Sequence, residues 1–271
     1  MLFRPIRHGR CDSTNQRALA ALESGDAQHG DVHLALEQTS GRGRLGRRWH
    51  SAPGEGLYLS VVLKPQPPAS PGLPLCLTMA GGLAVLDLAR GLGLAGAALK
   101  WPNDVLVAGA KLSGVLVESR GFDPSAPSFV LGIGVNVEQR QFPAELLAER
   151  PVTSLWLCGA RAPVAEVETR LLGVLAGLLE QALGAEASGA PARLAARFAL
   201  ELGLLGRPVA IERGPRRQLG RLLDLTLEHA ELEGPAGRER IPLAHISALT
   251  AAEAGAPAIE HRSNSGAPPA V

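Results

Sequence analysis

The chain contains little lysine and few aromatic residues. Of its 27 basic residues only three are lysines, Lys64, Lys100 and Lys111, and aromatic residues make up 3% of its 271 residues. Arginine therefore serves wherever charge alone matters. A retained lysine marks a candidate position for a compact ammonium group, because the two side chains are not interchangeable.

Other absences exclude whole classes of protein. The three cysteines, Cys11, Cys76 and Cys158, are scattered and odd in number, which favours reduced thiols in the cytoplasm over a disulfide framework or a zinc site. The N-terminus lacks the apolar run of a signal peptide, and no stretch of about 18 residues is apolar without a charge, Gly or Pro. We therefore expect neither secretion nor a membrane span. The net charge of +1 argues against general nucleic-acid binding as the main activity.

The composition supports a folded protein with one large and one small domain. Hydrophobic residues make up 46% and charged residues 20%, enough for a substantial core. Periodicity and turn residues predict helices at 13–23, 75–93, 163–184 and 190–204, and strands at 31–37, 57–63, 97–101, 104–109, 111–119 and 128–137. Short strands follow from residue 206. We predict a catalytic domain over 1–204, a small β-domain over 205–250 and a disordered tail over 251–271.

A loop rich in glycine and arginine, residues 40–56 (the Gly/Arg loop), carries the first candidate site. Residues 41–46 match G-x-G-x-x-G, but the following residues cannot begin a helix, so we reject a dinucleotide fold. The loop suits an anion instead, because glycines expose backbone N–H groups and Arg42, Arg44, Arg47 and Arg48 offer forked donors. A solvated basic loop, or a segment for single-stranded nucleic acid, is the alternative.

Two further residues, Lys111 and Asn136, each have one functional and one structural interpretation. Lys111 stands on a strand near Gly114, so its ammonium group could lie against a ligand, or it could pair with Glu118 at the surface. Asn136 lies inside an apolar strand and must be hydrogen-bonded, either to the backbone or to a ligand. We find no P-loop, no His-Glu-x-x-His, no Cys-x-x-Cys and no Gly-x-Ser-x-Gly motif.

Five segments, taken together in order and spacing, resemble the signature series of biotin–protein ligases, also called biotin–[acetyl-CoA-carboxylase] ligases. They are Asp12-Ser13-Thr14-Asn15, the run from Glu37 to Trp49, Lys100-Trp101-Pro102-Asn103-Asp104, Lys111-Leu112-Ser113-Gly114 and Gly132-Ile133-Gly134-Val135-Asn136. The resemblance covers roughly residues 10–250. It implies an α+β fold similar to class II aminoacyl-tRNA synthetases, with a mixed sheet, followed by a small Src-homology-3-like β-barrel.

The same resemblance implies an ATP-dependent ligase. Such an enzyme forms biotinyl-5′-AMP with the help of Mg²⁺ and passes biotin to a lysine of the biotin carboxyl carrier domain of acetyl-CoA carboxylase or a related carboxylase. Larger members carry an N-terminal DNA-binding domain, whereas the Ser-Thr-Asn motif here begins at residue 13. We therefore expect no repressor function and no specific DNA binding. The oligomeric state stays open, with a homodimer as one possibility.

Roles for individual residues also follow from the resemblance. The residues implied to hold biotin are Ser13, Thr14, Asn15, Gln38, Arg42, Gly43, Arg44, Lys111 and Gly114. Those implied to bind the nucleotide are Arg42, Arg44, Trp49, Asn103, Lys111, Asn136 and Trp156. Lys111 and Arg44 are the catalytic candidates, with Asp104 as the base or orienting group for the acceptor amine. A lipoate–protein ligase of the same fold, or a non-catalytic nucleic-acid module, stays the alternative.

Overall fold

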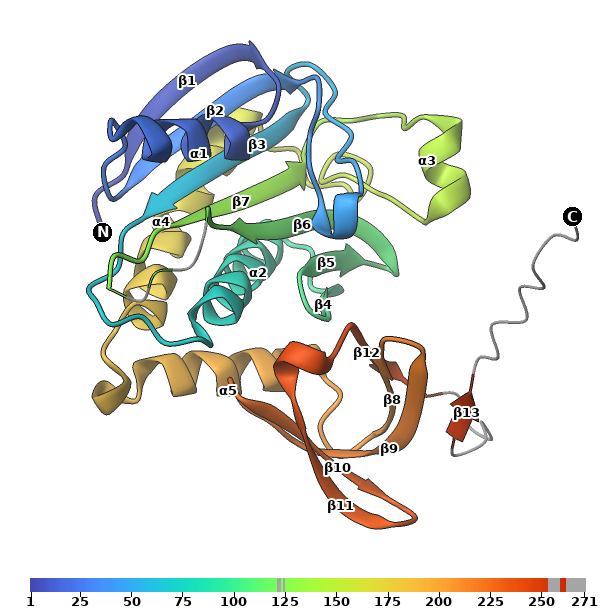
Figure 1. Ribbon diagram of the computed structural model, residues 1–271. Coiled ribbons are helices and arrows are strands. Elements are labelled where there is room, and N and C mark those ends of the chain that lie inside the picture. Colours follow the sequence, from blue (N-terminus) through green and yellow to red (C-terminus); the bar gives the residue numbers. More distant parts are fainter. Residues whose placement is uncertain (121–122, 124, 253–258, 262–271) are drawn as a thin grey trace, which may run out of the picture. The chain divides into compact units, whose positions relative to one another are not determined.

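The computed structural model describes residues 1–120, 123, 125–252 and 259–261 (Figure 1). The chain divides into two compact units, Met1–Phe198 and Ala199–Val271. This division falls within a helix, while the sequence predicts a domain boundary after residue 204.

The first unit is built on a seven-stranded mixed sheet with the order β1-β2-β3-β7-β6-β5-β4. Only β1 and β2 run parallel; every other neighbouring pair is antiparallel. The strands are β1 (Arg4–Cys11), β2 (Asp31–Gln38), β3 (Gly56–Leu63), β4 (Ala97–Lys100), β5 (Asp104–Val107), β6 (Ala110–Glu118) and β7 (Phe129–Asn136). The predicted mixed sheet is confirmed.

Five helices accompany the sheet. They are α1 (Thr14–Ser24), α2 (Leu73–Gly91), α3 (Ala144–Glu149), α4 (Val164–Ala182) and α5 (Ala190–Leu202). Helix α1 packs in one core cluster with Val130 of β7, whereas Gly81 of α2 lies against Leu131. Successive residues of a strand point to opposite faces, so α1 and α2 cover opposite faces of the sheet.

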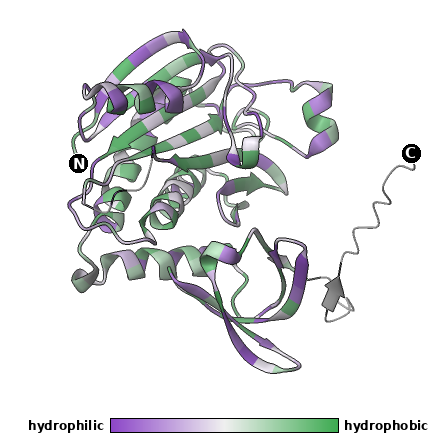
Figure 2. Cartoon of the chain, in the orientation of Figure 1, coloured by the Kyte–Doolittle hydropathy of each residue, from purple (hydrophilic) through white to green (hydrophobic). Residues whose placement is uncertain are grey.

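Helix α2 forms the centre of the core. It is long and apolar enough to cross a membrane by length and composition, but 78% of its most apolar window is buried inside the protein. Strand β3 is buried along its whole length. Figure 2 shows hydrophobic residues gathered in these central elements. A helix covered on all sides by a sheet and other helices needs this composition, so burial explains its hydropathy.

The second unit is an antiparallel sheet with the order β11-β10-β9-β8-β12, and β13 also pairs with β9. Its strands are β8 (Pro208–Arg213), β9 (Arg216–Leu225), β10 (His229–Gly234), β11 (Gly237–Pro242), β12 (Ala248–Ala251) and β13 (Ile259–His261). The small C-terminal β-domain is confirmed. Ala251 and residues 259–261 form strands where disorder was expected; residues 253–258 and 262–271 lie outside the described residues.

Five of the helices and strands in the described residues were not predicted: β1, α3, β10, β12 and β13. Strand β1 lies at the edge of the sheet, and Cys11 is its only buried residue. Helix α3 buries no residue. An element that buries little carries no hydrophobic period, and hydrophobic period is the main signal that a single sequence offers.

Candidate functional site

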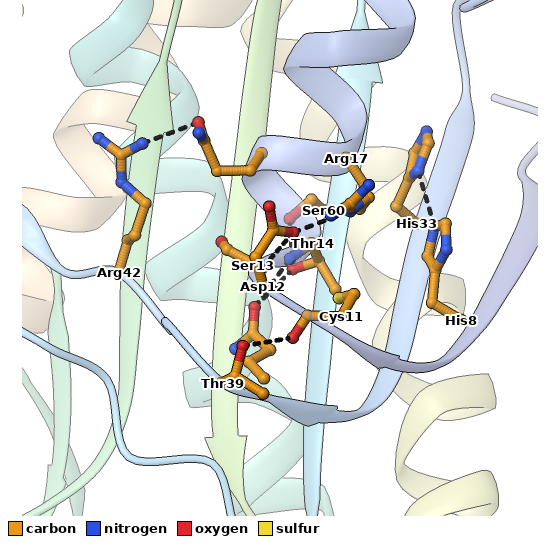
Figure 3. Close-up of polar contacts among 12 residues, drawn as sticks. His8, Cys11, Asp12, Ser13, Thr14, Arg17, His33, Thr39, Arg42 and Ser60 are labelled. Atoms are coloured by element: carbon orange, nitrogen blue, oxygen red, sulfur yellow. Dashed lines mark hydrogen bonds and ion pairs between the residues drawn. The ribbon is translucent and has the colours of Figure 1, made fainter.

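A cluster of polar side chains surrounds the first turn of α1. The Thr14 backbone N–H donates to Gln38 Oε1 over 2.8 Å, so a side chain at the end of β2 satisfies a free N–H group of the helix. The Ser60 hydroxyl of β3 donates to Asn15 Oδ1 over 2.5 Å and lies 2.7 Å from the Thr14 hydroxyl. Figure 3 shows Thr14 and Ser60 side by side beneath the start of α1.

The predicted residues Ser13, Thr14 and Asn15 are therefore brought together with Gln38, and all three are buried. The Asn15 amide is fully used within the protein, since Nδ2 donates to Glu118 Oε2 over 2.8 Å. Its Oδ1 lies so close to the β7 backbone that a Cβ at Gly132 would be 2.2 Å away. The Asn15 side chain thus packs directly against the backbone of Gly132.

Three glycines, Gly114, Gly132 and Gly134, form a strip without side chains on the sheet (the glycine strip). Gly132 and Gly134 are two residues apart on β7 and so share a face, and Gly114 of β6 pairs directly with Gly134. This is the face that α1 covers, because it also includes Val130. A Cβ at Gly134 would be 2.5 Å from Cε2 of the Trp49 indole, so Trp49 packs on this strip.

The Gly/Arg loop folds back on itself and thereby holds Trp49 in place. Gly43 N–H donates to Arg47 O over 2.7 Å, and Trp49 N–H donates to Gly41 O over 2.9 Å. Between them lies a single 3-10 turn, Arg44–Gly46, in which Leu45 has a φ of 57°. No longer helix follows the glycines, which agrees with rejecting a dinucleotide fold.

Lys111, Asp104, Arg44 and Asn103 form a cationic cluster beside the glycine strip. Lys111 Nζ lies 2.5 Å from Asp104 Oδ1, and the two side chains are 13% and 19% exposed. Lys111 Nζ is also 5.6 Å from the centre of the Trp49 ring. Arg44 Nη1 donates to Asn103 Oδ1 over 3.3 Å, which ties the loop to the turn between β4 and β5.

Burial governs the electrostatics of this cluster. Desolvation lowers the pKa of Lys111, and the neighbouring Asp104 carboxylate partly offsets that effect. Burial likewise lowers the pKa of Arg44, again opposed by Asp104. Asp104 thus acts on both cations, while Arg150 and Lys100 further lower the pKa of Lys111 and Arg47 that of Arg44. An incoming anion would stabilise this excess of positive charge. The surface pairing of Lys111 with Glu118, one of the two interpretations of the sequence, is wrong.

Asn136 anchors a neighbouring segment. Its Nδ2 donates to Thr153 O over 2.8 Å, while Leu155 N–H donates to Asn136 O over 3.0 Å. The Asn136 amide is satisfied by backbone, the structural alternative for this residue. The segment so held carries Trp156, whose ring has the guanidinium carbon of Arg161 3.8 Å from its centre.

Three residues of the site, Ser60, Gly132 and Gly134, had no predicted role, and Glu118 was considered only as a surface partner of Lys111. The alternation Gly132-Ile133-Gly134 in an apolar strand was a usable signal, because glycine within a strand often marks close approach of another group. Ser60 offered no such signal, because a serine in an apolar strand has many structural explanations.

Two observations bear on what the site could hold. Trp49 Nε1 is buried and has no acceptor among the described residues, so its N–H is available to a ligand. No three His, Cys, Asp or Glu side chains in the described part of the chain gather as ligands for a metal ion.

Known proteins match this sequence and fold. The model of the Biotin/lipoate A/B protein ligase family matches residues 9–137. The biotin–[acetyl-CoA-carboxylase] ligase of Paracoccus denitrificans is 35% identical over 253 residues, which cover 88% of this chain and 97% of that protein. The chain belongs to the biotin protein ligase family. Among solved members, the biotin protein ligase from Aquifex aeolicus in complex with biotin and ATP has a TM-score of 0.73 and 29% identity, covering 92% of this chain and 99% of that one.

Other relatives of the biotin protein ligase family are longer. The bifunctional ligase/repressor BirA of Bacillus subtilis is 36% identical over 139 residues, and the chain spans only 41% of the length of that protein. The α+β fold with a mixed sheet and a small C-terminal β-domain is that of the biotin protein ligase family, as predicted. The five segments that carry the resemblance lie around the face of the sheet that α1 covers.

Proposed function

We propose that this protein is an ATP-dependent biotin–protein ligase that forms biotinyl-5′-AMP and transfers biotin to a lysine of a carrier domain. The observation that carries the proposal is the glycine strip, which joins the polar cluster to the cationic cluster. Asn15 lies on it at Gly132, while Lys111 Nζ would lie 3.2 Å from a Cβ at Gly114. A ligand with a polar head and an acidic tail fits this order of groups.

The polar cluster favours biotin over lipoate. The ureido ring of biotin has two N–H donors and a carbonyl acceptor, whereas the dithiolane ring of lipoate has none. Ser13, Thr14 and Gln38 supply hydroxyl and amide groups at this end of the strip. Thr14 and Gln38 already bond to each other, to Ser60 and to Ser51. The ureido group can exchange hydrogen bonds with this network, whereas an apolar ring would gain none from it. Lipoate stays the second candidate because it shares the fold.

In the first step the biotin carboxylate attacks the α-phosphorus of ATP. A carboxylate O–P bond forms, the bond to the bridging oxygen breaks, and pyrophosphate leaves. Both reactants are anionic, so Lys111 and Arg44, with Arg42 from the Gly/Arg loop, offset their repulsion as charge builds. Mg²⁺ bound to the phosphates would supply further charge neutralisation.

In the second step the acceptor lysine attacks the acyl carbon of the adenylate. A C–N bond forms, AMP leaves with the electrons of the broken C–O bond, and the amine loses a proton. We assign to Asp104, whose Oδ1 lies 2.5 Å from Lys111 Nζ, the role of orienting Lys111 and accepting that proton. No enzyme nucleophile is needed. The Gly/Arg loop and Trp49 exclude water from the mixed anhydride, which would otherwise hydrolyse.

The acceptor we propose is the biotin carboxyl carrier domain of acetyl-CoA carboxylase or a related carboxylase. Trp156, stacked with Arg161, would flank the adenine. The three cysteines are free thiols, in keeping with a reducing cytoplasm. The nucleic-acid alternative predicts a binding affinity that falls steeply with salt concentration, so a titration at two salt concentrations tests it.

The direct test is the intact mass of a purified carrier domain incubated with the protein, ATP, Mg²⁺ and either biotin or lipoate. We expect a single biotin adduct that depends on ATP. A lipoate adduct alone would keep the reaction and overturn the assignment of the polar cluster. No adduct with either acid, and no pyrophosphate release, would overturn the proposed function.

A further inference from the structure

Glu118, the last residue of β6, lies between the polar cluster and the Gly/Arg loop. Its Oε1 lies 2.9 Å from Arg42 Nη2, and its Oε2 accepts from Asn15 Nδ2 over 2.8 Å. Each carboxylate oxygen thus serves a different element. Among the described contacts of this site, Glu118 is the side chain that joins α1 to the loop through both its oxygens.

The position of Glu118 in the sheet explains how it reaches both elements. Glu118 and Gly114 are four residues apart on β6, so they share a face. Its partner across the ladder is Val130, which packs in the same cluster as α1. The carboxylate therefore rises from the sheet beside the glycine strip. Its side chain is 18% exposed and that of Arg42 is 44% exposed, so the pair is only partly screened by solvent.

A second contact reinforces this anchor. Arg42 Nη1 donates to Gln16 Oε1 of α1 over 2.8 Å (Figure 3, where Arg42 is labelled). The Arg42 guanidinium is therefore held at two points, by a carboxylate from β6 and by an amide from α1. Planar, forked hydrogen bonding of this kind fixes orientation as well as distance.

We propose that Glu118 is a positioning residue that couples the polar cluster to the Gly/Arg loop, by holding Arg42 and Asn15 with the two oxygens of one carboxylate. The chain of contacts runs from Gln38 through Thr14, Ser60 and Asn15 to Glu118 and Arg42. A ligand that orders Thr14 and Gln38 thereby favours the placed loop, and a placed loop favours the ligand, since such coupling is reciprocal. The ligand part of this inference rests on the proposed function.

The test uses Glu118→Gln, which keeps the size of the side chain. Its single carbonyl oxygen can accept from Asn15 or from Arg42 but not from both, because the NH₂ group that faces the other donor cannot bond to it, and in either orientation the charge that held Arg42 is lost. Glu168→Gln is the matched control, because Glu168 forms a two-point pair with Arg7 on the first strand, with distances of 2.7 and 3.0 Å. Each variant is compared with the wild-type full chain.

The first readout is trypsin cleavage within the Gly/Arg loop, which contains Arg42, Arg44, Arg47 and Arg48. Without any ligand, we expect cleavage in Glu118→Gln to be about tenfold faster than in wild type, as expected for loss of one charge-assisted bond. Glu168→Gln should match wild type. Arg42→Gln loses both contacts of its guanidinium, so cleavage at the remaining sites Arg44, Arg47 and Arg48 should rise at least as much. Adding Glu118→Gln to Arg42→Gln should have no further effect.

The second readout is enzymatic. We expect Glu118→Gln to raise the KM for biotin about tenfold and to increase pyrophosphate release in the absence of acceptor, with a much smaller change in kcat. A purely structural role of Glu118 would lower thermal stability and kcat without loop-specific cleavage. Equal cleavage and equal KM in Glu118→Gln and wild type would overturn the inference. If wild type itself ligates neither acid, the proposed function fails, while the ligand-free cleavage comparison still decides whether Glu118 anchors the loop.

Discussion

Gly134→Ala tests whether Trp49 packs on the glycine strip in the working enzyme. The added Cβ would lie 2.5 Å from Cε2, 2.7 Å from Cζ2 and 2.9 Å from Nε1 of the indole. Carbon atoms in contact are about 3.5–4.0 Å apart, so the ring or the strand must move by about 1 Å. No rotation of a methyl group can relieve this, because the conflict is with the Cβ itself.

Two structures could absorb the strain. Strand β7 is paired on both sides, with β3 and β6, so shifting it disturbs two ladders and costs about 1–3 kcal/mol as overpacking does. Trp49 is half-buried, stands on a loop, and its Nε1 has no acceptor in the described part of the chain. The ring is therefore the part that moves. The substitution then destabilises the placed conformation of the loop and leaves the free energy of unfolding nearly unchanged.

This argument predicts separate effects on stability and activity. If the placed loop alone is destabilised by about 1–3 kcal/mol, kcat/KM for carrier biotinylation falls about 5- to 150-fold. The Tm should stay within a few degrees of wild type. Thermal unfolding and steady-state kinetics on the same preparation measure both.

Matched glycine variants control for the substitution itself. Gly173 in α4 has no neighbour within 4 Å of a built Cβ, so Gly173→Ala should leave activity unchanged and stabilise the helix by about 0.5–1 kcal/mol. Gly114→Ala meets Trp49 at a milder 3.1 Å and should fall between the two. Native kcat/KM in Gly134→Ala would refute the packing of Trp49 on the strip. A large drop in Tm would place the strain in the sheet instead.

Four other variants test the remaining parts of the site and fold. Gly132→Ala would place a Cβ 2.2 Å from Asn15 Oδ1, so we expect about 1–3 kcal/mol less stability in urea unfolding; unchanged stability would mean that Asn15 moves freely. Lys111→Ala should reduce single-turnover adenylate formation by several orders of magnitude, and a rate near wild type would exclude Lys111 from the chemistry. Arg44→Gly should release adenylate, visible as increased labelling of a nucleophilic trap; an unchanged trap signal would contradict its role in the loop. Burial and the neighbouring histidine lower the pKa of His33 from 6.5 to about 4. Between these values the unfolded chain binds more protons than the folded one, so the free energy of unfolding falls as the pH falls. His33→Gln should flatten this dependence between pH 7 and pH 4.5, and an unchanged slope would assign it to other groups.

The local structure of the site could be predicted where one short segment determines it. The predicted strands at 104–109 and 111–119 place a turn where they meet, and Ala108 and Gly109 there have φ values of 49° and 80°. The helix predicted at 13–23 ends at Ser24, and Gly25, with a φ of 82°, follows it. In both cases a glycine marks the point where the chain needs a left-handed conformation, and that requirement is local.

Pairings between segments could not be predicted in the same way. Lys111 and Glu118 are seven residues apart on one strand, and seven residues of extended chain span about 23 Å, so they cannot meet. The hairpin instead brings the start of β5 to β6, and Asp104 pairs with Gly114. Lys111 therefore pairs with Asp104, and Glu118 contacts Arg42 and Asn15. A strand over residues 111–119 therefore excludes the Lys111–Glu118 pair.

The register of the sheet determines the whole arrangement. Gly114 and Glu118 on β6, Gly132 and Gly134 on β7, and Ser60 on β3 all point to the face that α1 covers, because Ser60 pairs with Gly132 and Gly114 with Gly134. The odd-numbered neighbours Val115 and Leu131 point to the opposite face and pack on α2. A slip of one residue in β7 would exchange the two sets, placing Leu131 and Ile133 under Trp49 and Asn15. Burial of Leu131 and Ile133 on the face opposite α1 therefore fixes the register of β7. In that register the glycines face α1, and Asn15 and Trp49 can pack against the sheet.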